Sequence, residues 1–257
     1  MRLGVCYGTD RAAFALRAGC DYIEMGFASL AGESDEDFSR DVDRLAAAGI
    51  RAEAMNCFMP GSNYSVLDPS TPERIAPLFD KGFARAQALG LEVAVFGSAG
   101  SRKITDPSMT KEEAYKRMVP FLRLAGDIAA QNGCKVAIET LSPKECNCVN
   151  SFREGIRLME MADHPAVGIL ADFYHLDANG DSLRDISLAG EKLFHCHIAS
   201  PGKRYYPLPG QDDLFYHRIA AALDNMGYTG RVSIEGKSDA PETELAESIA
   251  FLHTIFG

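Results

Sequence analysis

Five side chains in the second half of the sequence have the chemistry of metal ligands. They are Glu139, Asp172, Glu235 and two alternating histidines, His195 and His197, and each stands at or near the end of a short apolar stretch. Carboxylates and imidazoles suit Mn²⁺, Mg²⁺, Co²⁺ or Zn²⁺ better than a metal that prefers thiolates. Carboxylates brought close together would also repel one another without a cation between them. We therefore predict that the ends of these stretches meet around one divalent metal ion.

The apolar stretches that carry these side chains are predicted β-strands within a longer alternating pattern. Short apolar runs alternate with stretches in which apolar residues recur at helical spacing. The predicted strands are residues 3–7, 22–25, 51–57, 91–96, 135–140, 167–172, 192–198 and 231–235. The predicted helices are residues 11–18, 35–48, 72–89, 111–131, 152–161, 183–188, 213–226 and 241–255. Strands that alternate with helices in this way pair in parallel.

Eight strand–helix units in 257 residues predict an α/β fold, a closed (β/α)8 barrel of the TIM type, built by a single domain over residues 1–257. A doubly wound open sheet is the alternative, but no G-x-G-x-x-G motif follows the first predicted strand. Two domains would also fit the length, yet no linker rich in Pro, Gly or Ser separates them. In a TIM barrel all strands end on one face, and that face carries the active site. The predicted fold and the predicted metal site therefore support each other.

The charge balance and the N-terminus argue against several classes of protein. With 36 acidic and 26 basic residues, the formal net charge is -10, which is unfavourable for sequence-independent nucleic-acid binding. The first residues do not resemble a signal peptide, and no apolar run approaches the length of about 18 residues that a membrane span needs. Seven cysteines without a C-x-x-C pair are typical of reduced thiols used as small apolar side chains. We expect a cytoplasmic protein that binds a small molecule.

Two loops between the predicted elements are candidates for substrate binding. Residues 58–70 are rich in Pro, Gly and Ser, and long loops in compact domains are often binding loops. Residues 97–103 form a shorter stretch of Gly and Ser that we expect to be a flexible loop, and it ends in Arg102 and Lys103. These cations would bind an anionic part of a substrate, or they are solvated loop charges.

Four motifs make the sequence similar to the sugar phosphate isomerase/epimerase family of the xylose isomerase-like TIM barrel superfamily, which includes ketose 3-epimerases and hydroxypyruvate isomerases. Residues 138–145 read I-E-T-L-S-P-K-E, close to the family's I-E-P-L-N-x-x-E. Residues 172–175 match the family's D-x-x-H, residues 195–197 its H-x-H, and residues 234–235 its closing I-E. The motifs follow the family's order on the corresponding predicted strands, and the resemblance covers the whole chain.

The resemblance implies which of the matched side chains bind the metal. The implied ligands are Glu139, Asp172, His197 and Glu235. Mn²⁺ is the ion we expect, with Mg²⁺, Co²⁺ and Zn²⁺ as alternatives. His195 points the same way as His197 along a strand and is expected to support the metal site or pack beside it. A homo-oligomer is a further expectation from the family.

The resemblance also implies which side chains contact the substrate. Glu145 closes the first motif and His175 closes the second, and both would contact substrate oxygens. Ketose epimerases place an arginine six residues beyond the metal-binding histidine. Here that position is Lys203, followed by Arg204, so either would hold hydroxyls or a phosphate.

The implied chemistry is proton abstraction next to a carbonyl group. The metal would stabilise the developing enediolate, and Glu139 and Glu235 would stand on opposite faces of the carbon chain as base and acid. If both act on one carbon, the reaction is an epimerisation. If the proton moves between adjacent carbons, the reaction is an aldose–ketose isomerisation.

Two other functions are compatible with a barrel of this kind, and the sequence argues against a third. A metal-dependent dehydratase of an inosose or a dehydroshikimate-like ring would need the same base and metal. A non-catalytic sugar-binding barrel would keep the pocket without needing two opposed glutamates. An abasic-site endonuclease would need further histidines after the third and fourth strands, and residues 56–58 and 96–98 contain none.

Overall fold

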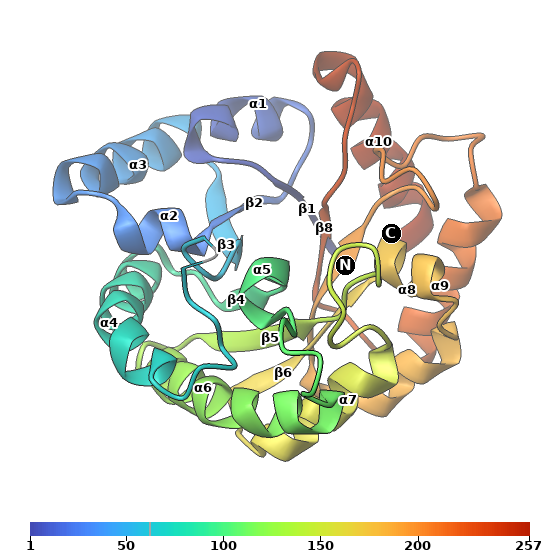
Figure 1. The fold of residues 1–257 in the computed structure, drawn as a ribbon. Helices are drawn as coiled ribbons and strands as arrows, with labels where there is room; N and C mark the ends of the chain where they lie inside the picture. Colours follow the sequence, from blue (N-terminus) through green and yellow to red (C-terminus); the bar gives the residue numbers. More distant parts are fainter. Residues whose placement is uncertain (62) are drawn as a thin grey trace.

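The protein is an eight-stranded parallel barrel surrounded by helices (Figure 1). The computed structural model describes residues 1–61 and 63–257. The strands are β1 Arg2–Cys6, β2 Tyr22–Gly26, β3 Arg51–Asn56, β4 Val93–Phe96, β5 Lys135–Glu139, β6 Val167–Asp172, β7 Leu193–Ile198 and β8 Arg231–Ile234. Each strand pairs in parallel with the next, and β8 pairs with β1 to close the barrel. The predicted fold is confirmed, and closure rules out the open sheet.

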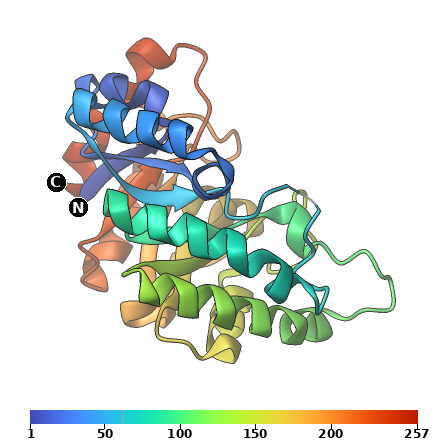
Figure 2. The same cartoon turned by 90° about the vertical axis from the view of Figure 1, so that its left-hand side faces the viewer.

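Helices and short helical turns follow the strands and cover the outside of the barrel. They are η1 Thr9–Arg11, α1 Ala12–Arg17, α2 Phe27–Gly32, α3 Asp35–Ala48, α4 Thr71–Leu89, α5 Ala99–Arg102, α6 Lys111–Gln131, α7 Phe152–Ala162, α8 Phe173–Asn179, η2 Leu183–Lys192, α9 Asp213–Asn225 and α10 Pro241–Phe256. Figure 2 shows α4 and α6 side by side on one flank, where they pack together. None of the helices that the structure describes combines the length and apolar character of a membrane span.

Local sequence signals account for the ends of the long helices. Gly49 and Gly90 end α3 and α4 in the left-handed conformation, with φ of 71° and 73°, where glycine has no Cβ to clash. Thr110 and Glu113 form a reciprocal capping box at the start of α6. These signals place the predicted boundaries of the three helices within one residue of the observed ones.

Three short helices at the strand ends differ from the prediction. The helices α2 and α8 were not predicted. The prediction of a flexible loop over residues 97–103 is wrong, because this stretch contains α5. The loop predicted over residues 58–70 contains no helix or strand in its described part, and residue 62 lies outside the described residues. The helices α2 and α8 follow their strands directly and α5 is separated from β4 by two residues, so all three lie at the end of the barrel that carries the predicted site.

The barrel interior is filled at the end opposite the site. Tyr22, Val95 and Leu170 belong to a small apolar cluster separate from the larger core between the strands and the helices. Tyr22 fits because Gly4 faces its ring on β1, where a Cβ would lie 2.5 Å from the ring atoms. Below this cluster, Glu53 accepts hydrogen bonds from the side chains of Arg2 and Arg231 at 2.5 and 2.6 Å. The interior is therefore filled at this end, and the cavity beside the predicted ligands lies at the carboxyl ends of the strands.

Candidate metal centre

Four side chains converge at the carboxyl ends of β5 to β8. Glu139 ends β5, Asp172 ends β6, His197 lies near the end of β7, and Glu235 follows β8. Strand register aligns them, because Asp172 pairs directly with His197 in neighbouring strands. One ligand atom from each residue lies within 4.8 Å of the ligand atoms of the other three. The four residues that the sequence predicted as ligands therefore share one site.

The polar atoms that face the centre of this cluster suit a cation. Glu139 Oε1 and His197 Nδ1 are buried and have no hydrogen-bond partner among the described residues. His197 Nδ1 lies 3.8 Å from Glu139 Oε1 and 3.2 Å from Glu235 Oε2. Unpaired buried polar atoms are costly, and a divalent ion between three carboxylates and one imidazole would satisfy them. The donor set fits a hard or borderline divalent metal.

The crowding of charge shifts the pKa values of the cluster in opposite directions. Burial alone would raise the pKa of Glu139, but His197, His175 and Arg204 outweigh it and bring the pKa to about 2. Burial, aided by the neighbouring glutamates, raises the pKa of Asp172 to about 6. For His197, the nearby carboxylates overcome burial and hold the pKa well above its usual value. The carboxylates therefore favour the protonated form of His197, although its ring is buried.

Asp172 has a second task that orders its carboxylate. Its Oδ1 accepts hydrogen bonds from the backbone N–H groups of Tyr174 and His175 at 2.8 and 3.2 Å, which caps the N-terminus of α8. This cap fixes the carboxylate and leaves Oδ2 facing the cluster, 3.6 Å from the His175 ring. One residue therefore starts a helix and lines the site.

His175 presents one ring nitrogen to the site. Its Nδ1 accepts a hydrogen bond from the backbone N–H of Ser142 at 3.2 Å, so the neutral ring carries its proton on Nε2. Nε2 is buried without a hydrogen-bond partner in the described chain, 3.9 Å from Glu139 and 3.8 Å from Glu145. The ring is thus a hydrogen-bond donor aimed into the cavity, and Glu145 lies beside it, as the sequence motif suggested.

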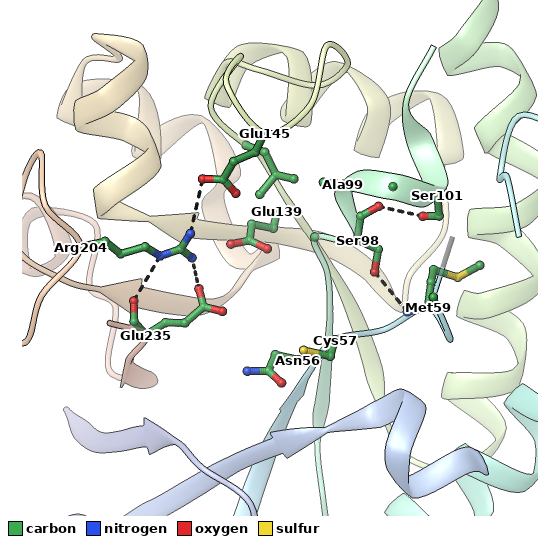
Figure 3. Close-up of a pocket in the computed structure, with 14 residues that line it drawn as sticks. Asn56, Cys57, Met59, Ser98, Ala99, Ser101, Glu139, Glu145, Arg204 and Glu235 are labelled. Atoms are coloured by element: carbon green, nitrogen blue, oxygen red, sulfur yellow. Dashed lines mark hydrogen bonds and ion pairs between the residues drawn. The ribbon is translucent and has the colours of Figure 1, made fainter. Parts of the chain in front are cut away.

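Arg204, and not Lys203, reaches the cluster. The Arg204 guanidinium lies 3.4 Å from Asp172 and 3.5 Å from Glu145, and it forms a close pair with Glu235 (Figure 3). Lys203 is exposed and borders a separate surface hollow. Of the two cations that we expected as alternatives for holding the substrate, the turn at residues 201–204 directs only Arg204 toward the cluster.

Arg102 is also placed differently from the prediction. It is fully buried in α5, and its Nη1 donates a hydrogen bond of 2.6 Å to the backbone carbonyl of Glu139. It therefore ties the α5 segment to the end of β5 from behind and does not line the cavity. Lys103, its partner in the predicted anion site, is exposed.

The cavity beside the cluster has a neutral far wall. It encloses about 440 Å³ between the carboxylates and the ends of β3 and β4. Figure 3 shows Asn56, Cys57, Met59 and Ser98 on the side away from Arg204. Gly97 lies against Glu139, and a Cβ there would overlap the carboxylate. Met59, Gly97 and Ser98 lie in the two loops that the sequence predicted as candidates for substrate binding. Asn56 and Cys57 were not predicted to line the site, because small neutral side chains at a strand end carry no chemical signature.

Sequence reasoning also missed Glu24. This residue is 1% exposed on β2, and its carboxylate contacts the rings of His195 and His197. A signal was present, since Glu24 is the only charged residue in the apolar stretch 22–25. His195 itself lies behind the cluster, as expected, and contacts Glu24 and Ser233.

Comparisons with known proteins agree with this architecture. The model of a family described as "Xylose isomerase-like TIM barrel" matches residues 12–255. An L-ribulose 3-epimerase from Methylomonas sp. is 26% identical over 230 residues, which cover 88% of this chain and 77% of that protein. The crystal structure of D-psicose 3-epimerase with D-tagatose from Clostridium cellulolyticum H10 superposes with a TM-score of 0.87 at 18% identity, covering 100% and 99% of the two chains. A structure of the IolI protein with a bound zinc atom superposes with a TM-score of 0.69 at 21% identity, covering 99% and 96%.

Proposed function

Because the chain belongs to the xylose isomerase-like TIM barrel family, we propose that it is a sugar isomerase or epimerase that depends on one divalent metal ion. Two of the proteins named above, the L-ribulose 3-epimerase and the D-psicose 3-epimerase, are epimerases, which supports an enzyme of this class. The observation that carries the metal is the convergence of Glu139, Asp172, His197 and Glu235 within 4.8 Å of one another. A cation held by these residues would supply positive charge where negative charge develops on the substrate oxygens.

Glu139 and Glu235 are the proposed acid and base. They come from β5 and from the end of β8, and both border the cavity. One would remove a proton from the carbon next to the carbonyl, and the other would return a proton. Proton return to the opposite face of the same carbon gives an epimer, whereas return to the neighbouring carbon gives an isomer.

Three further side chains are proposed to hold the substrate. His175 would donate a hydrogen bond through Nε2, and Glu145 would accept one from a hydroxyl group. Arg204 now pairs with carboxylates of the site, and its guanidinium would donate to a substrate oxygen when the sugar enters. The contacts of these residues with the cluster support their roles.

We further propose Mn²⁺ as the working ion and a reducing cytoplasm as the location. Oxygen ligands with a single imidazole suit Mn²⁺ and also accept Mg²⁺, Co²⁺ or Zn²⁺. All seven cysteines are free thiols, which supports the second proposal. Elemental analysis of protein purified without added metal tests the first, by showing which ion is retained at one per chain.

Exchange of substrate protons with deuterium tests the proposed reaction. Metal-loaded protein is mixed with ketoses, ketose phosphates and inososes in D₂O and followed by proton NMR. We expect exchange at a carbon beside the carbonyl, lost on metal removal and in Glu139→Gln and Glu235→Gln. The exposed Glu242→Gln is the matched control and should exchange at the wild-type rate. The product distinguishes an epimer, an isomer and a dehydrated ring.

Binding of a sugar without exchange by metal-loaded protein would contradict the proposal and favour a sugar-binding barrel. Unchanged exchange in Glu235→Gln would show that the proton is moved by another group.

A further inference from the structure

The carboxylate of Glu24 lies directly behind the metal centre, and we propose that Glu24 is a positioning residue that fixes the orientation of His197 for metal binding. Glu24 Oε1 lies 2.9 Å from His197 Nε2, and Glu24 Oε2 lies 2.7 Å from His195 Nε2. All three side chains are at most 1% exposed. This inference rests on the proposed function, since it concerns how the protein holds the same ion.

The contact with Glu24 determines which nitrogen of His197 faces the cluster. A carboxylate accepts hydrogen bonds only, so His197 Nε2 must carry the proton in this contact. Nδ1 is then the nitrogen available to a metal, and it lies 3.2 Å from Glu235 and 3.8 Å from Glu139. Glu24 thus selects both the ring rotamer and the nitrogen that can bind the ion.

A second set of contacts holds Glu24 itself in place. His195 Nε2 lies within hydrogen-bond distance of both Glu24 Oε2 and Ser233 Oγ, the latter at 3.1 Å. Ser233 Oγ in turn lies 2.8 Å from the hydroxyl group of Tyr22. These contacts join β2, β7 and β8 across the barrel interior. They also account for the two alternating histidines, because one faces the metal centre and the other anchors the carboxylate behind it.

The charge of Glu24 is unusual in its surroundings. Within the described residues, its ion-pair partners are the two imidazoles alone, without a lysine or arginine. Burying a carboxylate this deep in a barrel costs desolvation free energy unless its partners compensate for the lost hydration. An apolar side chain would fill the same space without that cost. A negative charge behind an imidazole makes the opposite nitrogen a better metal ligand. Metal binding is therefore the function that this buried carboxylate serves.

Direct metal titration of substituted proteins tests the inference without any sugar. Co²⁺ or Zn²⁺ is titrated calorimetrically into metal-free wild type and Glu24→Gln, and the visible spectrum of bound Co²⁺ reports ligand geometry. We expect the affinity of Glu24→Gln to fall by about 10- to 100-fold, with a shifted Co²⁺ spectrum. Glu53→Gln is the matched control, because Glu53 is a buried strand carboxylate at the opposite end of the barrel. Its metal affinity and Co²⁺ spectrum should equal those of wild type.

The titration distinguishes a failure of the positioning role of Glu24 from a failure of the proposed metal dependence. Wild-type affinity and an unchanged Co²⁺ spectrum in Glu24→Gln would overturn the positioning role. If wild type itself binds no divalent ion, the proposed metal-dependent function fails. If Glu24→Gln does not fold, Glu24→Asp takes its place, since the shorter side chain keeps the charge but cannot reach both rings. An affinity about tenfold lower is then expected, and a wild-type affinity would overturn the inference.

Discussion

Gly97 shows how a residue without a side chain can shape a reactive centre. It follows β4, and a Cβ at this position would overlap the carboxylate of Glu139. The requirement is for space, so any substitution must push Glu139 away from the other ligands. This close approach places a constraint on the site that no charged residue would reveal.

Substitution of Gly97 by alanine should therefore impair the reaction without removing any functional group. We expect deuterium exchange to slow by about 100-fold, since a displacement near 1 Å at a reacting group has an effect of this size. Gly32→Ala is the control, because a Cβ on Gly32 meets no atom within 4 Å. Equal exchange rates in the two variants would contradict the proposed role of Glu139.

Arg204 and Lys203 are adjacent in sequence, but we expect their substitution to have different effects on the reaction. Arg204→Met removes the cation that contacts Asp172, Glu145 and Glu235, and kcat/KM for the sugar should fall by about 100-fold or more. Lys203→Met alters an exposed side chain outside the cavity and should leave kcat/KM unchanged. Steady-state kinetics of both variants decide between them, and a larger loss in Lys203→Met would mean that the turn rearranges when substrate binds.

At the scale of single elements, α8 depends on a metal ligand for its first turn. Asp172 caps this helix, so its substitution has two separable effects. Asparagine keeps a hydrogen-bond acceptor at the cap, whereas alanine removes it. In metal-free protein, we expect Asp172→Ala to be less stable than Asp172→Asn by about 1 kcal/mol. Urea denaturation measures the difference, and metal titration should show weak binding in both variants. Identical unfolding midpoints would show that the cap contributes no stability.

The elements that the sequence predicted well are the ones with a repeating pattern. The eight strands are short apolar runs that recur between the helices, and the long helices have several turns of apolar residues at helical spacing. The ends of these elements lie within about two residues of the prediction. The helices α5 and α8 have four and seven residues, too few for a periodic pattern. Because Arg102 and His175 lie in these two helices, their surroundings depended on tertiary packing that the sequence pattern does not encode.

In the candidate site too, the residues that follow a pattern were predicted and those without a pattern were not. Acids and histidines at strand ends gave the four converging residues, because a parallel barrel brings those ends together. Glu24 was missed because a single carboxylate within a strand has no pattern of its own. Arg204 could not be separated from Lys203, since the direction of each side chain depends on a turn in which Arg204 adopts a φ of 58°.

At the scale of the whole molecule, the carboxylates at the two ends of the barrel have different surroundings. Several carboxylates line the cavity at the site end, whereas a carboxylate at the opposite end is paired with arginine side chains. There Glu53 is 6% exposed and bonds to Arg2 and Arg231, which come from the first and last strands. The backbone N-terminus also donates a hydrogen bond of 3.4 Å to the carbonyl of Phe256 in α10. These contacts bring the chain ends together where the barrel closes.

Loss of the Glu53 charge should therefore weaken the closed barrel as a whole. We expect Glu53→Gln to lower the free energy of unfolding by about 1–3 kcal/mol, since a buried acceptor for two arginines is lost. Glu242→Gln removes an exposed pair with Arg11 and should change it by less than about 0.5 kcal/mol. Urea denaturation of metal-free proteins gives both values, and equal unfolding midpoints would show that the pairing does not support closure.

The division of the cavity between two halves of the chain has a consequence for engineering. The residues proposed to carry out the chemistry come from β5 to β8 and the segments after them, whereas the neutral far wall comes from the ends of β3 and β4. A designer could therefore vary Asn56, Met59 and Ser98 in a library while leaving every ionisable group of the centre untouched. Such a library would explore new sugars on a fixed reaction, with Gly97 as the one wall position to be held constant.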